Sequence, residues 1–225
     1  MNMRRFLQIA SMWILTLTLT FIGSILYATH LNPSFFLFQT TPRLRIPQIY
    51  SIHDENQNGI NDTQDLIDGA RFEVKNQPVY ASAYYQGGYP PDAEGVCSDV
   101  IWRAFKHAGY DLKKLIDLDI QKRTKSYTRV DGKPDPNIDF RRVPNLLAFF
   151  RANATILTNE IHSGNPENLS QWQGGDIVLF DAPHPHIGIV SDKRDIMASH
   201  SSSIIAAPPH AKKQRSSTGM SISPQ

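Results

Sequence analysis

The chain has 225 residues, of which 40% are hydrophobic and 20% charged, the balance of one ordinary globular domain with short appendages. The formal net charge of +2 is too small for a nucleic-acid footprint, so no nucleic-acid partner is expected. The single cysteine excludes an intrachain disulfide and a four-cysteine metal site. Its thiol is therefore either a small buried hydrophobe or a reactive group.

Residues 1–30 have the pattern of a signal anchor. Arg4 and Arg5 precede residues 6–28, which carry no formal charge. At about 1.5 Å per residue, a helix of that length spans roughly 30 Å of hydrocarbon. Positive charge before the apolar run favours an inside N-terminus, so we expect the rest of the chain outside the cytoplasm, anchored to a bacterial membrane. Residues 26–28 offer only a mediocre signal-peptidase site, and cleavage there would give a secreted protein.

Residues 31–53 form a tether, and residues 54–68 begin with a match to the twelve-residue calcium loop. Oxygen ligands occupy loop positions 1, 3, 5, 9 and 12, glycine occupies position 6, and the carbonyl of an apolar residue serves at position 7. The predicted ligands of a structural Ca²⁺ are Asp54, Asn56, Asn58, Ile60, Asp62 and Asp65. Because aspartate replaces the usual glutamate at position 12, we expect weak affinity, suited to millimolar external calcium. The alternative is a polar surface turn.

Residues 69–195 have the pattern of one α+β domain. Residues 97–108 place their apolar side chains on one helical face, and Gly109 ends this helix. Shorter helices are expected at residues 112–119 and 143–152.

Two short β-rich runs, residues 176–180 and 187–190, are separated by a proline-containing turn and predict a hairpin. Residues 196–225 are rich in Ser, Pro, Ala and Lys and show neither a helical nor a strand period, so we expect a disordered tail.

The thiol of Cys97 stands at the start of the amphipathic helix, directly after a glycine-rich stretch. A helix N-terminus lowers a thiol pKa through its unpaired N–H groups and its positive dipole end, which favours a nucleophile. His186, at the mouth of a β run, is the histidine best placed to act as its general base. From spacing alone, a packing role is the more common one for a lone cysteine at a helix start, so that interpretation stays open.

Residues 84–91 (YYQGGYPP) and 95–99 (GVCSD) resemble the Tyr-x-x-Gly-Gly…Cys-Ser signature of NlpC-type cell-wall peptidases. The segments GVCSDVIWRAFKHAGYDL, DPNIDFRRVPNL and HIGIVSD resemble the bacterial family called domain of unknown function 1287. These segments span about half the chain. The resemblance implies a papain-like fold, in which the helix bearing the nucleophile packs on a small antiparallel sheet, and thiol catalysis without a cofactor.

The same resemblance implies roles for individual residues. Cys97 is the nucleophile, His186 the base, and Tyr84 supplies a hydroxyl near the thiol. Arg141 and Arg142 are candidate ligands of a substrate carboxylate, and Asp99 is assigned to the helix dipole or to the same substrate site. For the two arginines, structural ion pairs with Asp135 or Asp139 are the open alternative.

The pattern of the resembled family breaks after residue 195. Its next strand supplies a polar residue that orients the catalytic histidine, whereas this chain continues with residues 196–203, where His200 is the substitute available. We therefore expect a truncated C-terminal part and an impaired third catalytic position.

Two functions follow from these patterns. The first is thiol-dependent hydrolysis of an amide bond in peptidoglycan peptides, with the anchor holding the enzyme at the membrane. The second is a non-catalytic, membrane-anchored module that binds cell-wall or protein ligands. The substrate class in either case rests on resemblance and location.

Overall fold

The computed structural model describes residues 3–31, 46–162, 164–180, 185–194, 204–205 and 219–224. The chain divides into two units, residues 1–43 and residues 44–225. The first unit contains a single described helix, α1 (Met3–Leu31). Its hydroxyl side chains donate to carbonyls of the preceding turn, as Thr18 Oγ1 does to Ile14 and Leu15. Among the described residues, no helix reaches the combined length and hydropathy that a membrane crossing requires.

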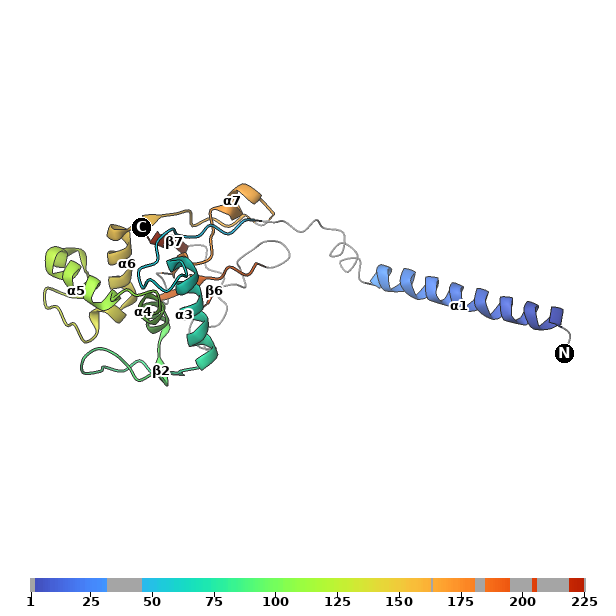
Figure 1. Ribbon diagram of the computed structural model, residues 1–225, viewed down its shortest axis with the longest axis horizontal. Coiled ribbons are helices and arrows are strands. Elements are labelled where there is room, and N and C mark those ends of the chain that lie inside the picture. The colour runs from blue at the N-terminus through green and yellow to red at the C-terminus, as the bar shows by residue number, and fades with distance from the viewer. Residues whose placement is uncertain are drawn as a thin grey trace. The chain divides into compact units, whose positions relative to one another are not determined.

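The second unit mixes helices with two small sheets, which confirms the mixed α and β character expected from the sequence (Figure 1). The helices are α3 (Asp62–Asn76), α4 (Cys97–His107), α5 (Leu112–Arg123), α6 (Val143–Asn153) and α7 (Pro166–Ser170), with 3₁₀ turns η1 (Thr124–Ser126) and η2 (Asp139–Arg141). The strands of the main antiparallel sheet, in spatial order, are β3 (Ala154–Ile156), β7 (Gly219–Pro224), β4 (Ile177–Phe180), β5 (His186–Val190) and β6 (Ile204–Ile205). A two-stranded parallel ladder joins β1 (Val79–Tyr80) to β2 (Glu94–Gly95).

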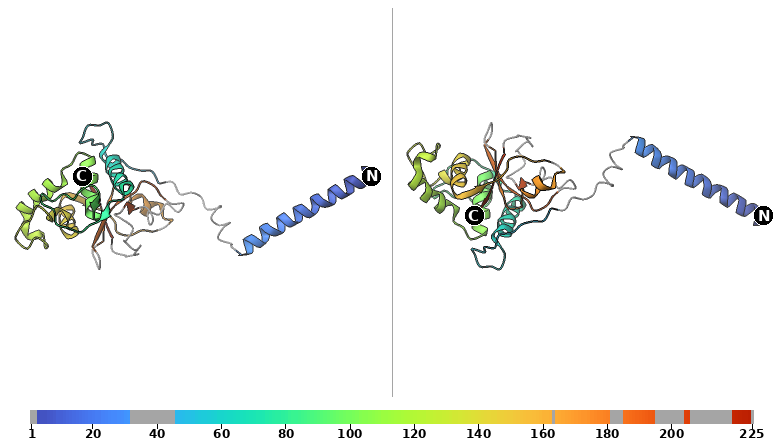
Figure 2. Two further views of the ribbon diagram at one scale, coloured as in Figure 1. Left: turned by 90° about the horizontal axis from the view of Figure 1, so that it is seen from below. Right: turned by 90° about the horizontal axis from the view of Figure 1, so that it is seen from above.

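Helix α4 lies at the centre of this unit. It contacts α3 and β5, and the views of Figures 1 and 2 place α3 on one side of it and α5 with α6 on the other. Its apolar residues Val100, Ile101, Ala104 and Phe105 are buried in the core. A helix with this much contact is held by tertiary burial more than by its own propensity.

Strands β4 and β5 alternate between two faces, as the pleat requires. Ile187 and Ile189 join the core that includes α4, whereas Val190 packs with Val178 and Trp172 in a separate cluster. Ile187 is paired with Leu179, so both strands present an aliphatic face toward α4. The predicted hairpin is thereby confirmed, and its turn (residues 181–184) lies outside the described residues.

The three helices expected from the sequence are confirmed as α4, α5 and α6, although α5 continues to Arg123. Two expectations differ from the structure. Part of the predicted tether belongs to the folded second unit, because Gln48 exchanges hydrogen bonds of 2.9 Å with Gly174. Residues 204–205 and 219–224 of the predicted disordered tail are strands, and β7 inserts between β3 and β4. Backbone pairing with existing strands stabilises such segments without any strong period of their own.

Candidate functional site

Cys97 is the first residue of α4 and is half-buried against the core. Backbone N–H groups of Ile187, in β5, and of Ser98 and Cys97, at the helix start, act to lower the pKa of its thiol. The residue before it, Val96, is extended with φ −126° and ψ −180°, which turns the chain sharply into the helix. The structure therefore brings the thiol and the start of the histidine strand together.

The helix start is fixed by a buried ion pair between Asp99 and Arg141. Arg141 Nε and Nη2 donate to the two carboxylate oxygens of Asp99 over 2.7 and 2.8 Å, and both side chains are almost fully buried. The same carboxylate accepts the N–H of Val96 at 2.7 Å and the indole N–H of Trp102 at 2.8 Å. Asp99 thus caps the N-terminus of α4 and fixes the backbone next to Cys97.

This pair changes the interpretation of the predicted substrate arginines. Arg141 is occupied by Asp99 and by the carbonyl of Ala83 at 2.9 Å, so neither it nor Asp99 presents a free charge to a ligand. Arg142 pairs with Asp139 at 2.9 Å, as the structural alternative anticipated. The partner of Arg141 was not anticipated, because Asp99 lies 42 positions away in the chain.

Burial raises the pKa of the Cys97 thiol, and this effect outweighs the N–H groups of Ile187 and Ser98, which act in the opposite direction. The nearby Asp99 carboxylate raises the pKa further. The expectation that the helix N-terminus would lower this pKa is therefore wrong in its net direction. Burial among core side chains destabilises the thiolate more than the N–H groups at the helix N-terminus stabilise it.

His186 is the first residue of β5 and is half-buried, with its ring stacked near Phe180 at a centroid distance of 6.3 Å. Burial lowers the pKa of its imidazole. Because side chains alternate along a strand, the ring leaves β5 on the Phe180 face, whereas Ile187 faces the core that contains Cys97. The thiol therefore adjoins the start of β5 on the core side, and the hydrogen bonds of the described residues do not include one between the imidazole and the thiol.

Both ionisable groups are consequently neutral near pH 7. A thiol with a raised pKa stays protonated, and an imidazole with a lowered pKa stays unprotonated and able to accept a proton. A resting thiolate–imidazolium ion pair is therefore disfavoured.

The hydrogen bonds of the Tyr84 hydroxyl, among the described residues, do not include one to the thiol. Its exposed side chain donates to Asp135 Oδ1 at 3.3 Å and accepts from Asn137 Nδ2 at 2.8 Å. Asn137 also accepts the N–H of Gly87 at 2.9 Å, which docks the glycine-rich stretch on the loop before η2. The structure therefore gives Tyr84 a loop-bracing contact in place of the predicted one.

A cavity of about 690 Å³ has a lining that includes neither Cys97 nor His186. Its walls include apolar residues of α5 and α6, among them Leu115, Leu118 and Phe149, and the segment Ile49–Ser51. Sequence reasoning missed this cavity, because its wall combines the supposed tether with helices that lie about 70 to 100 positions further on. Small-molecule ligands usually bind in concave, mostly apolar cavities of this size.

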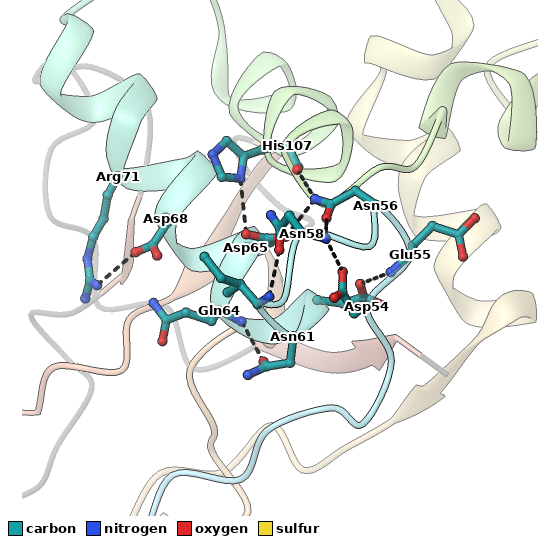
Figure 3. Close-up of polar contacts among 12 residues, drawn as sticks. Asp54, Glu55, Asn56, Asn58, Asn61, Gln64, Asp65, Asp68, Arg71 and His107 are labelled. Atoms are coloured by element: carbon teal, nitrogen blue, oxygen red, sulfur yellow. Dashed lines mark hydrogen bonds and ion pairs between the residues drawn. The ribbon is translucent and has the colours of Figure 1, made fainter.

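The predicted calcium loop packs between α3 and α4 (Figure 3). Asp54 accepts the N–H groups of Asn58 and Gly59 at 3.1 and 2.8 Å, and Asn58 Oδ1 accepts the N–H of Ile60 at 2.7 Å. Helix α3 begins at Asp62 with Asn61 as its N-cap, whereas residues 46–53 before the loop are not helical. The loop therefore has the following helix of an EF-hand without the preceding one.

Among the described residues, no group of three or more His, Cys, Asp or Glu side chains is gathered as a metal site. The donor set of the loop is of another kind, since it relies on asparagine and main-chain oxygens as well as carboxylates. His184 and His200, the other histidines weighed for the site, lie outside the described residues.

Comparison with known proteins gives one family and one relative. The family described as "Domain of unknown function (DUF1287)" matches residues 67–214, the whole stretch from α3 to beyond β6. The uncharacterized protein YijF of Escherichia coli (strain K12) is 40% identical over 136 residues, which cover 56% of this chain and 63% of that protein. The match thus spans less than two thirds of the relative's length, and no solved structure is significantly similar. The chain belongs to the domain of unknown function 1287 family.

Proposed function

We propose that this protein is an extracytoplasmic thiol hydrolase, an amidase or peptidase of peptidoglycan peptides, with Cys97 as nucleophile and His186 as base. One observation carries the proposal: the only thiol of the chain starts α4, and α4 packs on β5, the strand that begins with His186. The papain-like fold is part of the same proposal, supported by the contact of α4 with β5.

The chemistry proceeds in two balanced steps. The imidazole accepts the thiol proton while sulfur attacks the amide carbonyl carbon. The carbon–nitrogen bond then breaks, and the amine leaves with that proton, which gives a thioester. Water next attacks the thioester, passes one proton to the imidazole and releases the carboxylic acid, and the proton returns to sulfur.

Backbone N–H groups at the helix start are available to the negative oxygen that develops during each attack. A donor of this kind contributes about 3 kcal/mol to the stabilisation of a transition state. The neutral resting pair also explains how a buried thiol is compatible with catalysis, because the proton moves only as the bond to carbon forms.

The substrate class and the compartment rest on the sequence. The signature at residues 84–99 is similar to that of cell-wall peptidases, and the charged start before residues 6–28 favours export. The cleaved bond, an amide of a peptidoglycan peptide, is proposed from this resemblance and from the location.

The test is incubation of peptidoglycan with the full chain, followed by separation of the released fragments. Wild-type protein is expected to release new peptide or amine ends, and Cys97→Ala and His186→Ala are expected to release none. His162→Ala is the matched control, because the His162 side chain is exposed and its Nε2 lies 3.3 Å from the exposed carboxylate of Glu160. Fragment release by Cys97→Ala, or none by wild-type protein, would contradict the proposal.

A non-catalytic binding module is the second candidate, and the cavity favours it. Its lining excludes both Cys97 and His186, so a ligand there would not meet the thiol. This function predicts that Leu118→Trp, which fills the cavity, abolishes peptidoglycan binding while Cys97→Ala leaves it unchanged. If the protein is instead a hydrolase, Cys97→Ala is expected to abolish fragment release and Leu118→Trp to leave it unchanged.

A further inference from the structure

The residues of loop 54–65 arrange oxygen atoms around one end of α3. Asn56 Oδ1 and Asn58 Oδ1 each accept a single backbone N–H, at 3.0 and 2.7 Å. An amide oxygen has two lone pairs, so each of these oxygens keeps one for another partner. Gly59 stands at the sharp turn with φ +87°, which a side-chain-bearing residue rarely adopts.

Asp65 supplies an independent observation. The residue is fully buried, and its Oδ1 has no hydrogen-bond partner, which is costly for a carboxylate. The nearest ring nitrogen, His107 Nδ1, lies 3.7 Å away, beyond hydrogen-bonding distance. The other oxygen, Oδ2, faces the loop and accepts the amide N–H groups of Asn56 and Asn58 at 2.8 and 3.0 Å (Figure 3). A buried carboxylate with an unsatisfied oxygen, next to the two asparagines of this loop, is a group whose charge a hard cation would balance.

We propose that residues 54–65 bind one Ca²⁺ through Asp54, Asn56, Asn58, the Ile60 carbonyl and Asp65. Asp62 is left out of the proposed ligand set, because its carboxylate accepts the hydroxyl of Tyr110, which lies outside the loop, as well as the N–H of Glu55 at 2.9 Å. Asp54, by contrast, accepts only N–H groups of the loop itself. Water takes its place, as is common at the ninth position of such loops.

The cation would act on the packing of α3 against α4. Asn56 Nδ2 donates to the carbonyl of His107 at 2.9 Å, at the C-terminal end of α4, while Asp65 belongs to α3. Gly109 fits closely against Asn56, since a Cβ there would lie 2.9 Å from the Asn56 Cβ. Calcium bound between these groups holds the loop, α3 and the end of α4 together, so binding is expected to stabilise the folded domain.

The test is thermal unfolding of the full chain against increasing CaCl₂ after removal of metal with EGTA, at constant ionic strength. Sites with few carboxylates bind with a Kd of about 10⁻⁴ to 10⁻³ M. At ten times that concentration, Tm is expected to rise by about 3–5 °C, and MgCl₂ is expected to give less than a third of this rise. Terbium provides a second readout: excitation of Tyr110, which contacts the loop through Asp62, should sensitise emission that Ca²⁺ displaces.

Two variants separate a ligand from a structural residue. Asp65→Asn is expected to lose the calcium-dependent rise in Tm, yet to melt no lower than wild type in EGTA, because it removes an unsatisfied buried oxygen. Asp68→Asn on the same helix is the matched control, since Asp68 is partly exposed and pairs with Arg71 at 3.8 Å. Asp54→Asn replaces the first variant if that one does not fold.

Loss of the calcium effect in Asp65→Asn but not in Asp68→Asn supports the site. No rise in wild-type Tm with calcium, an equal rise with magnesium, or an unchanged rise in Asp65→Asn and Asp54→Asn overturns it. The result is independent of hydrolysis, because no step of the proposed reaction involves the loop.

Discussion

Replacement of Arg141 by alanine tests whether the buried pair with Asp99 holds the start of α4. The change removes two charge-assisted hydrogen bonds of 2.7 and 2.8 Å and leaves a carboxylate whose side chain is 1% exposed. Breaking one side of a buried ion pair costs about 3–5 kcal/mol, chiefly because the remaining charge is left uncompensated.

The contacts that remain set the value within this range. Asp99 keeps the N–H groups of Val96 and Trp102, which offset part of the loss. The bond from Arg141 to the carbonyl of Ala83 is lost as well. We therefore expect the free energy of unfolding to fall by about 3 kcal/mol, a large share of the 5–15 kcal/mol typical of a folded domain.

Urea unfolding of the full chain, followed by fluorescence, measures this change. With an m value of about 2 kcal/mol/M, a loss of 3 kcal/mol lowers the midpoint by about 1.5 M. Arg142→Ala is the matched control: Asp139 is as buried as Asp99, but Arg142 itself is 32% exposed, so its removal opens Asp139 to water, and Asp139 retains the N–H of Asp135 at 2.7 Å. A cost of about 1 kcal/mol is expected there.

A second substitution isolates the stranded charge. Asp99→Asn added to Arg141→Ala should recover part of the stability, because the amide is neutral. Equal midpoints for Arg141→Ala and Arg142→Ala, or no recovery in the double variant, would refute the argument that an unpaired buried carboxylate dominates the energetics here.

Two further predictions follow from local geometry. Gly88→Ala should lower stability by about 1–3 kcal/mol more than Gly132→Ala in urea unfolding: both glycines have positive φ, but only at Gly88 does the added Cβ approach a ring, that of Phe140, at 2.8 Å. Equal costs would show that backbone strain alone matters. Alkylation of Cys97 by iodoacetamide should accelerate with pH toward an inflection above the ordinary 9.0, because burial raises the thiol pKa. An inflection below 7, lost in His186→Ala, would instead show a thiolate–imidazolium pair.

The helical period of residues 97–108 and the β-rich runs near residue 180 were sufficient to predict α4 and the β4–β5 hairpin. Each is a local pattern whose apolar side faces the core. Helix α3 was not predicted, because most of its buried positions are small or acidic residues such as Ala70 and Glu73. Glu73 is buried because Arg103 pairs with it at 2.7 Å, a partner 30 positions away that no local pattern indicates.

The sequence alone determined the family segments, the position of Cys97 at a helix start and the order of donors in loop 54–65, because these depend on neighbours within a few residues. The tertiary structure decided the direction in which the pKa values of the thiol and the imidazole shift, the partner of Arg141 and the hydrogen bond between Tyr110 and Asp62. Desolvation and pairing depend on which distant groups surround an atom after folding, and those neighbours are set by packing.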